Sequence, residues 1–203
     1  MSEVRPLVVK VGGGLLRDDG LDGLARGCAE AIVLARERSV LVVPGGGPFA
    51  DAVRAVDAAV GLPDDVAHAL ALRAMDQLGL LLAPLLPGAE LLTRLKAPRS
   101  LGLLQVAPAF DNRPEVPQSW NVTSDSLAVL AAGAIGAEEA LLLKPFDVPR
   151  AKLTAGELKA LQEAGGGRVV DRYLPTAVCR TGVGVVLRAP GADSRSGTRV
   201  SPR

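Results

Sequence analysis

Two apolar runs that each end in three glycines constrain this chain more than any other feature. The first, at residues 7–11, carries Lys10 and leads into glycines 12–14; the second, at residues 40–43, leads through a proline into glycines 45–47. Strands that end in glycines present backbone N–H groups to an anion, because no Cβ stands in the way. A fixed ammonium group beside them can neutralise charge that builds up during phosphoryl transfer. The pattern predicts two strands of an α/β sheet whose turns hold a phosphate chain between them.

Glycine-rich turns also occur as plain strand-to-helix connections without a ligand. The lysine in the first run and the repetition of the turn favour a phosphate site over that alternative. A Walker loop is excluded, because no stretch has a glycine, four residues and then Gly-Lys-Ser or Gly-Lys-Thr. The second turn fits the relaxed dinucleotide spacing Gly45-x-Gly47-x-x-Ala50. Its helix is expected to lead into a second helix and not into a strand that ends in an acidic residue, which argues against a dinucleotide site.

Length and composition indicate one large α/β domain. The chain has 203 residues, of which 48% are hydrophobic and 2% aromatic, so the core has to be built from Leu, Val and Ala. The net charge of +1 provides no overall field that would attract nucleic acid or an anionic membrane. The two cysteines, Cys28 and Cys179, lie in apolar segments with no CxxC spacing and no second ligand nearby. We expect buried reduced thiols and no metal site.

Apolar periodicity and turn residues give the order of the elements. After the strand at 7–11 we expect a helix at 21–38, a parallel strand from residue 40 reached by a right-handed crossover, and a helix that begins near residue 49. The further expected elements are a helix at 64–82, a strand at 89–95, short strands with an irregular loop at 96–119, a helix from about 123 to 136, a strand at 139–147, a helix at 155–164 with a capping box of Thr154 and Glu157, a C-cap at glycines 165–167, a short helix around 177–179 and a strand at 182–187. This order predicts a three-layer α/β/α sandwich with a mainly parallel central sheet. We expect a single domain at residues 1–188 and a disordered tail at residues 189–203, which are rich in Ser, Gly and Arg.

The start of the chain lacks the pattern of a signal peptide, because the apolar run that follows is short and contains Lys10. No stretch approaches the ~20 uninterrupted apolar residues of a membrane helix. The run at 78–86 is brief and contains Pro84. We therefore expect a cytoplasmic protein without a membrane or nucleic-acid partner.

Polar groups gather at the ends of two further elements. Thr123 or Ser124 is a natural N-cap for the helix that follows, and Asp125 in its first turn suits the helix dipole. A capped helix needs no other explanation, but the density of hydroxyl groups beside the only tryptophan exceeds what one cap requires. A later strand ends at Lys144 and Asp147, and the carboxyl end of a parallel strand faces the ligand crevice of an α/β sheet.

The order of these parts resembles the amino acid kinase superfamily, which includes acetylglutamate, uridylate and isopentenyl phosphate kinases. The resemblance spans residues 7 to about 187. It implies a kinase that transfers the γ-phosphoryl group of ATP, with Mg²⁺, to a phosphate or carboxylate oxygen of a small acceptor. It also implies that Lys10 stabilises charge on the transferred group, and that Asp125 holds this lysine in place while accepting backbone N–H bonds.

The resemblance further implies which residues contact the two substrates. The implied ATP-binding residues are Gly12, Gly13, Gly14, Thr123, Ser124, Lys144 and Asp147. The implied acceptor-binding residues are Gly45, Gly46 and Gly47. We hypothesise in addition that His68 binds the phosphate of the acceptor and that Asp76 pairs with an ammonium group on it.

Within the superfamily, the short chain and the segments at 67–68, 74–77 and 119–126 look most like the small kinases of methanofuran biosynthesis, which phosphorylate an aminomethylfuran methyl phosphate. Such kinases usually have serine where Gly14 stands and glycine where Val148 stands, so the nucleotide site is expected to differ in detail. Two alternatives stay open. One is an isopentenyl phosphate or uridylate kinase-like enzyme, the former with a long apolar acceptor pocket and no buried acid; the other is a non-catalytic nucleotide- or oxyanion-binding protein. We expect a homo-oligomer, a dimer or larger.

Overall fold

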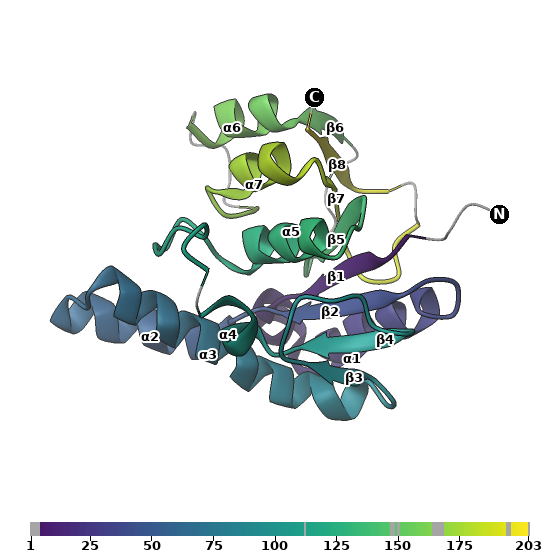
Figure 1. The fold of residues 1–203 in the computed structure, drawn as a ribbon, viewed down its shortest axis with the longest axis horizontal. Helices are drawn as coiled ribbons and strands as arrows, with labels where there is room; N and C mark the ends of the chain where they lie inside the picture. The colour runs from purple at the N-terminus through teal and green to yellow at the C-terminus, as the bar shows by residue number, and fades with distance from the viewer. Residues whose placement is uncertain are drawn as a thin grey trace.

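The computed structural model describes residues 5–111, 113–146, 149, 151–163, 169–193 and 196–202, which form an eight-stranded sheet with helices on both faces (Figure 1). The strands are β1 (Leu7–Val11), β2 (Val40–Pro44), β3 (Glu90–Leu92), β4 (Leu101–Leu104), β5 (Glu139–Leu143), β6 (Ala151–Thr154), β7 (Gly184–Arg188) and β8 (Thr198–Ser201). Their order in the sheet is β3-β4-β2-β1-β5-β7-β8-β6, and all neighbours are parallel except β7 and β8. The predicted fold class is therefore confirmed.

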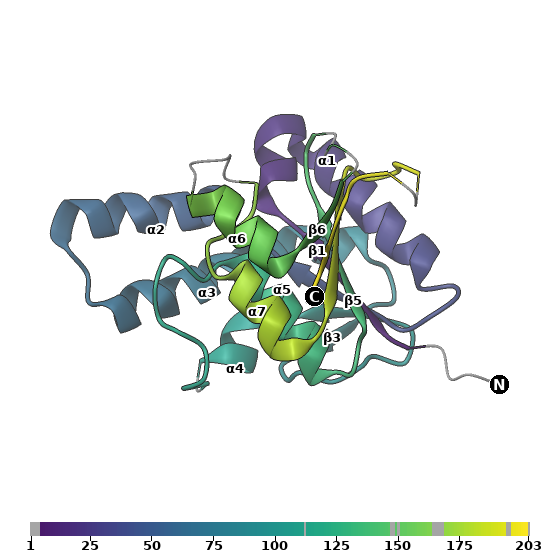
Figure 2. The ribbon, with the colours of Figure 1, turned by 90° about the horizontal axis from the view of Figure 1, so that it is seen from above.

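Two apolar cores hold the three layers together, one on each face of the sheet. The helices are α1 (Gly13–Leu34), α2 (Gly47–Val60), α3 (Asp64–Leu82), α4 (Val106–Phe110), α5 (Ser124–Ala134), α6 (Ala155–Glu163) and α7 (Leu174–Thr181), with a 3₁₀ turn at Ala83–Leu85. Successive side chains of β1 alternate between the faces: Val8 packs in the core with α5 and α7, and Val9 packs in the core with α1. Figure 2 shows α1 on one side of the sheet and α5, α6 and α7 on the other.

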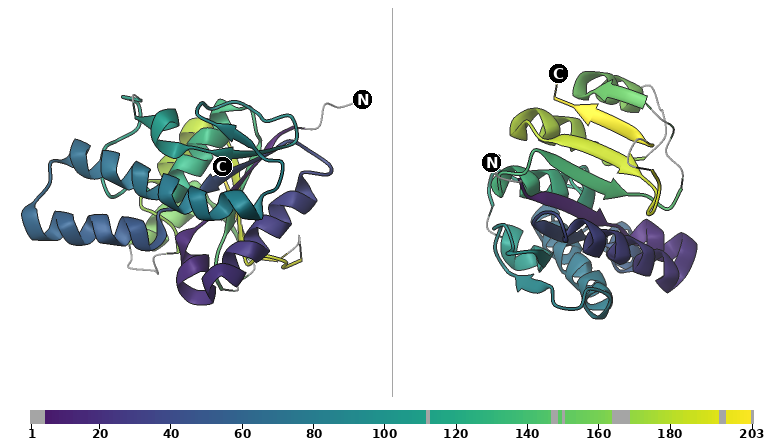
Figure 3. Two further views of the ribbon diagram at one scale, coloured as in Figure 1. Left: turned by 90° about the horizontal axis from the view of Figure 1, so that it is seen from below. Right: turned by 90° about the vertical axis from the view of Figure 1, so that its right-hand side faces the viewer.

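The centre of the sheet gathers the ends of β1, β2 and β5. β1 lies between the other two, with Lys10 beside Val43 on one side and Leu142 on the other. Later strands join the sheet on both sides of β1. At such a point in a parallel sheet, a crevice for a ligand is expected where the carboxyl ends of the strands meet. The helical hairpin of α2 and α3 projects beyond the sheet from this end (Figure 3).

Several element boundaries differ from the sequence prediction. The helix expected at 21–38 begins at Gly13, because two glycines of the first turn already belong to α1, and Gly20 interrupts it with a φ of 61°. The stretch expected to hold an irregular loop contains the short helix α4, and β6 was not predicted. The helix at 64–82 and the capping box of Thr154 and Glu157 are confirmed.

The prediction of a disordered tail at residues 189–203 is wrong for residues 198–201, which form β8 between β7 and β6. Val200 is 2% exposed in the core, so this strand has an apolar reason to join the sheet. The connection before it is held down as well, since the Arg188 guanidinium pairs with Glu30 of α1 and Gly191 N donates to the same carboxylate. The composition predicted disorder because most residues of this segment are polar, and a single valine does not reveal that it is buried.

The two cysteines differ in burial. Cys28 of α1 is buried, as predicted, and burial raises the pKa of its thiol to about 12. Cys179 is exposed on α7, so the prediction of a second buried thiol is wrong. By length and hydropathy, the segment Asp64–Leu85 would suffice to cross a membrane, but the core helix of a domain passes the same test, and 44% of its apolar window is buried here.

Candidate active site

A carboxylate between two lysines forms the buried centre of the site. The Lys10 ammonium nitrogen lies 3.0 Å from Asp125 Oδ1, and Lys144 Nζ donates a hydrogen bond of 2.9 Å to Asp125 Oδ2. Each of the three residues is only 6% exposed. Charges this deeply buried have to be paired, and one carboxylate neutralises only one of two ammonium groups. These three groups together therefore carry a net positive charge, which favours an anion.

Three elements bring this centre together. Lys10 comes from β1, and Lys144 follows the neighbouring parallel strand β5. Asp125 lies in the first turn of α5, where unpaired N–H groups and the helix dipole favour a carboxylate. Asp125 was predicted to hold Lys10, and in the structure it contacts Lys144 as well.

Burial and ion pairing act in opposite directions on these groups. Burial raises the pKa of Asp125, but Lys10 and Lys144 outweigh it and hold that pKa well below its usual range. Burial, with the charge of Lys10, lowers the pKa of Lys144 to about 8 against the opposing effect of Asp125. At neutral pH Asp125 and Lys144 are both charged. Among the described residues, Asp125 Oδ1 accepts no backbone N–H bond, contrary to the expectation from the resemblance, and its contact with the Lys10 ammonium group is an ion pair.

The two glycine turns pack directly on each other beside this centre. A Cβ at Gly13 would lie 1.9 Å from Gly47 Cα, and Gly47 itself has a φ of +54°, in the left-handed region that favours glycine. A Cβ at Gly12 would lie 2.3 Å from Lys10 Nζ. Glycine is thus required where the two backbones approach each other, and a side chain at Gly12 would displace the Lys10 ammonium group. The Lys10 ammonium group is at the turn and not in solvent.

A second carboxylate, that of the partly buried Asp171, organises the start of α5. Asp171 Oδ2 accepts hydrogen bonds from Thr123 N at 3.0 Å and from Ser126 N at 2.9 Å, and the Thr123 and Ser126 hydroxyls donate to the same side chain. Thr123 is the N-cap residue, as predicted, but its own side chain does not cap the helix. Burial and the charge of Asp125 raise the pKa of Asp171. The sequence analysis missed this residue, since nothing local marks an acid from a distant segment as a cap.

Two cavities meet at the charged centre. The larger, of about 730 Å³, extends past Lys144 and Phe146 to Asp171; we call it the large cavity. The smaller, of about 150 Å³, lies between the second glycine turn and α3; we call it the small cavity. The residues that line both are Lys10, Gly14, Arg17, Arg54, Trp120 and Thr123. Lys10 therefore faces a ligand in either cavity.

The predicted ATP-binding residues divide between the cavities. Gly14, Thr123 and Lys144 line the large cavity, together with the predicted catalytic residues Lys10 and Asp125. Gly13 and Ser124 line the small cavity, and Gly12 lies against the Lys10 side chain. Asp147 and Val148 lie outside the described residues.

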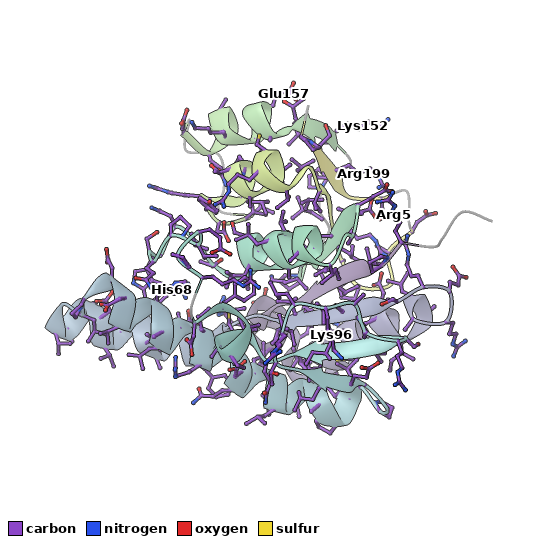
Figure 4. The ribbon with its side chains drawn as sticks, viewed as in Figure 1. Arg5, His68, Lys96, Lys152, Glu157 and Arg199 are labelled. Carbon is purple, nitrogen blue, oxygen red and sulfur yellow. The ribbon has the colours of Figure 1, made fainter. Side chains whose placement is uncertain are left out.

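Most of the predicted acceptor-binding residues lie together. Gly46, Gly47 and His68 line the small cavity, and Gly45 packs against the first glycine turn. His68, the only histidine of the chain, lies on α3, on the side toward the loop that leads into α5 (Figure 4). Burial lowers the pKa of His68, and Asp111 only partly opposes this, so the imidazole is neutral at pH 7.

Asp76 points away from the cavities, which corrects the hypothesis that it pairs with an acceptor. Its Oδ1 accepts a hydrogen bond of 2.5 Å from Val106 N, and its Oδ2 accepts one of 3.2 Å from Ala107 N. These are the first N–H groups of α4, so Asp76 stabilises the start of that helix. Among the described residues that line the two cavities, Asp76 does not occur. The sequence could not indicate this role, because α4 itself was not predicted.

Two arginines that the sequence analysis did not single out lie where the cavities meet. Arg17 belongs to α1 and Arg54 to α2, each one to two turns after the glycines that begin its helix. The sequence signal that could have identified them is their position one to two helical turns after the glycines. Trp120, noted only for its rarity, lies beside them.

The fold and the site together define a class: a mainly parallel α/β protein with an anion site at the carboxyl ends of its central strands. The sequence profile of the Amino acid kinase family matches residues 5–149, and the chain belongs to this family. A [5-(aminomethyl)furan-3-yl]methyl phosphate kinase from Methanocaldococcus jannaschii is 27% identical over 179 residues, which cover 83% of this chain and 80% of that protein. The protein is a kinase.

Solved structures support the fold. A uridylate kinase from Archaeoglobus fulgidus superposes with a TM-score of 0.72 at 16% identity, covering 96% of this chain and 99% of that one. A carbamate kinase from Giardia lamblia, bound to AMP-PNP, gives a TM-score of 0.64 at 13% identity and covers both chains completely. At such low identity these likenesses concern the architecture.

The site's chemistry fits a nucleoside triphosphate better than a metal cage. Among the described residues, no group of three or more His, Cys, Asp or Glu side chains is placed to hold a metal ion. The buried carboxylate Asp125 is engaged by two ammonium groups, which would repel a cation. A magnesium ion at this site would have to be held mainly by phosphate oxygens.

Proposed function

We propose that this kinase transfers the γ-phosphoryl group of ATP to a phosphate oxygen of a small phosphorylated acceptor. The observation that carries the proposal is the meeting of two cavities at Lys10, which lines both of them. A phosphoryl group that passes from one cavity to the other has to pass this ammonium group. Kinases rely on such positioning and charge stabilisation, since the protein contributes little covalent chemistry to phosphoryl transfer.

The large cavity is the proposed site of ATP. It has the volume for an extended ligand, and Lys144, Asp125 and the first glycine turn border it. The triphosphate would lie over Gly14 toward Lys10, and Mg²⁺ bound to its oxygens would neutralise part of its charge. The match to a carbamate kinase bound to AMP-PNP supports ATP as the donor. ATP and phosphorylated metabolites are cytoplasmic, so the proposal places the enzyme in the cytoplasm.

The transfer step needs no covalent intermediate on the protein. An oxygen of the acceptor's phosphate attacks the γ-phosphorus in line; the new P–O bond forms as the bond to the bridging oxygen breaks, and ADP leaves. The Lys10 and Lys144 ammonium groups neutralise charge on the transferred group and on the leaving oxygen. Asp125 holds both lysines in place, and its charge opposes the lowering of the pKa of Lys144 by burial.

The proposed acceptor is an aminomethylfuran methyl phosphate of methanofuran-type cofactor synthesis. The similarity to a kinase of that name supports this choice. The volume of about 150 Å³ supports a single small ring over a nucleoside, since an apolar cavity of about that size holds one benzene molecule. The ring would lie by His68, Met75 and Trp120.

Isopentenyl phosphate is a second candidate acceptor, which one observation favours. Among the described residues that line the small cavity, none carries a carboxylate that would pair with an amine, and several are apolar. The apolar members are Ala50, Ala71, Leu72, Met75, Val122 and Leu127. An alkyl phosphate would suit this lining as well as an aminomethylfuran does.

A coupled assay for ADP with purified protein, ATP and matched acceptors tests the proposal. We expect turnover with the aminomethylfuran phosphate and much less with the same furan lacking its phosphate. Preference for isopentenyl phosphate would select the second candidate. ATP binding with no ADP formed from any phosphorylated acceptor would contradict the kinase proposal and favour a non-catalytic nucleotide-binding protein.

A homo-oligomer is also proposed, on the exposed apolar side chains of the helical hairpin. Val56 and Val60 of α2 and Val66 and Leu70 of α3 are 38–66% exposed. Apolar surface of this kind is a common feature of subunit contacts. Light scattering on the purified protein tests it, and a mass of one chain at micromolar concentration would contradict it.

A further inference from the structure

Arg17, Asp51 and Arg54 form a charged cluster at the rim shared by the two cavities. Asp51 Oδ2 accepts a hydrogen bond of 2.5 Å from Arg17 Nη2, and Asp51 Oδ1 accepts one of 2.9 Å from Arg54 Nη1. Arg17 comes from α1 and the other two from α2, so the cluster spans the helices that follow the two glycine turns. With two guanidinium groups and one carboxylate, it carries a net positive charge.

Trp120 holds Arg54 from the other side. The guanidinium carbon of Arg54 lies 4.7 Å from the centroid of the Trp120 ring, a cation–π contact. The Trp120 ring is fixed in turn, since its Nε1 donates a hydrogen bond of 2.7 Å to Asp57 Oδ2 on α2. Arg54 is thus oriented by a carboxylate and an aromatic face, although 46% of its side chain is exposed.

The lining of the small cavity calls for an anionic ligand. Among the described residues that line it, the charged side chains are Lys10, Arg17 and Arg54, and no carboxylate is present. His68 is neutral at pH 7, and Lys10 is paired with Asp125. The two arginines are therefore the groups that can meet an anion as it enters from solvent. Guanidinium groups match the oxygens of phosphate with paired hydrogen bonds.

We propose that Arg17 and Arg54 form an oxyanion clamp for the phosphate of the acceptor, with Asp51 as the residue that positions them. The clamp deepens the proposed function, on which it rests only in taking the acceptor to be phosphorylated. It orients the acceptor's phosphate toward Lys10, where the cavities meet. It selects acceptors that carry a phosphate over neutral analogues of the same shape.

The γ-phosphate of ATP is another phosphate that the arginines could meet, because they line both cavities. Two features favour the acceptor. Asp51 lines the large cavity but not the small one, so its carboxylate faces the side where a triphosphate would be repelled. The donor phosphates already have Lys144, Lys10 and a glycine turn, whereas the described residues that line the small cavity include no other exposed cation.

Binding of inorganic phosphate tests the clamp without any turnover. Calorimetric titration of the full chain with phosphate is expected to show saturable binding. The double variant R17Q/R54Q is expected to weaken it at least tenfold, because each charge-assisted contact is lost. The sole tryptophan provides a second readout, since an anion on Arg54 should change Trp120 fluorescence in the native protein. Phosphate binding unchanged in the double variant would overturn the proposal.

Arg26 provides a matched control on the same helix. Arg26 of α1 pairs with Asp19 Oδ2 at 2.5 Å, and both are about as exposed as the clamp residues. Among the described residues that line the two cavities, neither occurs. R26Q should bind phosphate like the native protein, and a loss in R26Q equal to that in R17Q/R54Q would show a general charge effect and overturn the clamp. Thermal unfolding of each variant, with R17K and R54K as conservative replacements, separates loss of the clamp from loss of the fold.

Steady-state kinetics distinguishes the two sources of phosphate. R17Q and R54Q are expected to raise the KM for the phosphorylated acceptor at least tenfold while the KM for ATP changes less than twofold. D51N, which releases the arginines without removing them, should raise the acceptor KM less than either. A raised KM for ATP with an unchanged acceptor KM would overturn the assignment to the acceptor. If native enzyme turns over no acceptor, the proposed function fails, yet phosphate titration still decides whether the clamp exists.

Discussion

The site holds its positive charges in two opposite ways. At the ends of the central strands, Lys144 and Lys10 are buried and share the Asp125 carboxylate. At the rim shared by the two cavities, Arg17 and Arg54 are about half exposed and share Asp51. A buried charge acts strongly because little water screens it, and it cannot move without a large penalty.

Under the proposed function, this difference corresponds to a fixed donor side and an adaptable acceptor side. The strands of the sheet fix the positions of the lysines. Helical side chains at the surface set the arginines, and these can be replaced or repositioned at small cost.

The difference between the buried and the exposed ion pairs should be largest in the free energy of unfolding. D125N leaves two ammonium groups buried without a carboxylate, so we expect the free energy of unfolding to fall by about 3–5 kcal/mol. D19N removes an exposed partner of Arg26 and should cost less than about 1 kcal/mol. Urea denaturation at constant m-value measures both. Equal losses in the two variants would mean that burial does not set the strength of these pairs.

Removal of the shared lysine should have the largest effect on catalysis. K10A is expected to lower kcat by about 10²–10³-fold, the typical cost of losing one preorganised donor at the transferred group. K152A, at an exposed position on β6 far from the site, serves as the control (Figure 4). Steady-state ADP release measures both. A kcat of K10A close to the native value would contradict the proposal that Lys10 contacts the transferred group where the two cavities meet.

The close contact between Gly13 and Gly47 links the two glycine turns, and with them the proposed donor and acceptor sides. G13A places a Cβ against Gly47 Cα, so the turns have to separate, at a cost of about 1–3 kcal/mol in stability and with a loss of activity. The matched variant is G156A on α6, where the nearest atom, Thr154 Oγ1, lies 3.9 Å from the new Cβ. Thermal unfolding with activity assays compares them. If G13A behaves like G156A, the close approach is not required.

The donor side should respond to pH through Lys144. Since its pKa is about 8 in the folded protein, the ammonium charge is present below pH 8 and lost above it. The kcat/KM for ATP should fall about tenfold for each pH unit above 8. Stability changes in the opposite direction. Between pH 8 and about 10, Lys144 is protonated in the unfolded chain and largely deprotonated in the folded protein. The contribution of Lys144 to the free energy of unfolding therefore rises with pH in this range. A flat ATP profile from pH 7.5 to 9.5 would contradict this.

The smallest expected effect concerns Asp76, which lies outside both sides of the comparison. D76N weakens the hydrogen bonds to the start of α4 and should cost about 1 kcal/mol in stability. The KM for the acceptor and for ATP should both stay within twofold of the native values. A selective rise in the acceptor KM for an amine-bearing acceptor would restore Asp76 as a ligand.

Local sequence determined the elements that present phosphate-binding groups. Apolar runs that end in glycines identified β1 and β2, and an acid in the first turn of a capped helix identified Asp125. These patterns are visible because a strand, a turn and a helix start each lie within a few consecutive residues. The family resemblance rested on the same segments in order.

Only the tertiary structure decided which groups those segments meet. Asp171 reaches the start of α5 from a distant segment, Asp76 caps a helix that was not predicted, and β8 adds a strand to a tail that composition marked as disordered. The arginine cluster likewise joins α1 to α2. Pairing between distant segments depends on how the layers pack, and it cannot be predicted from the pattern of consecutive residues. The sequence therefore determined an α/β fold of the amino acid kinase family with its glycine turns and lysines, and packing decided how the charged groups pair around the two cavities.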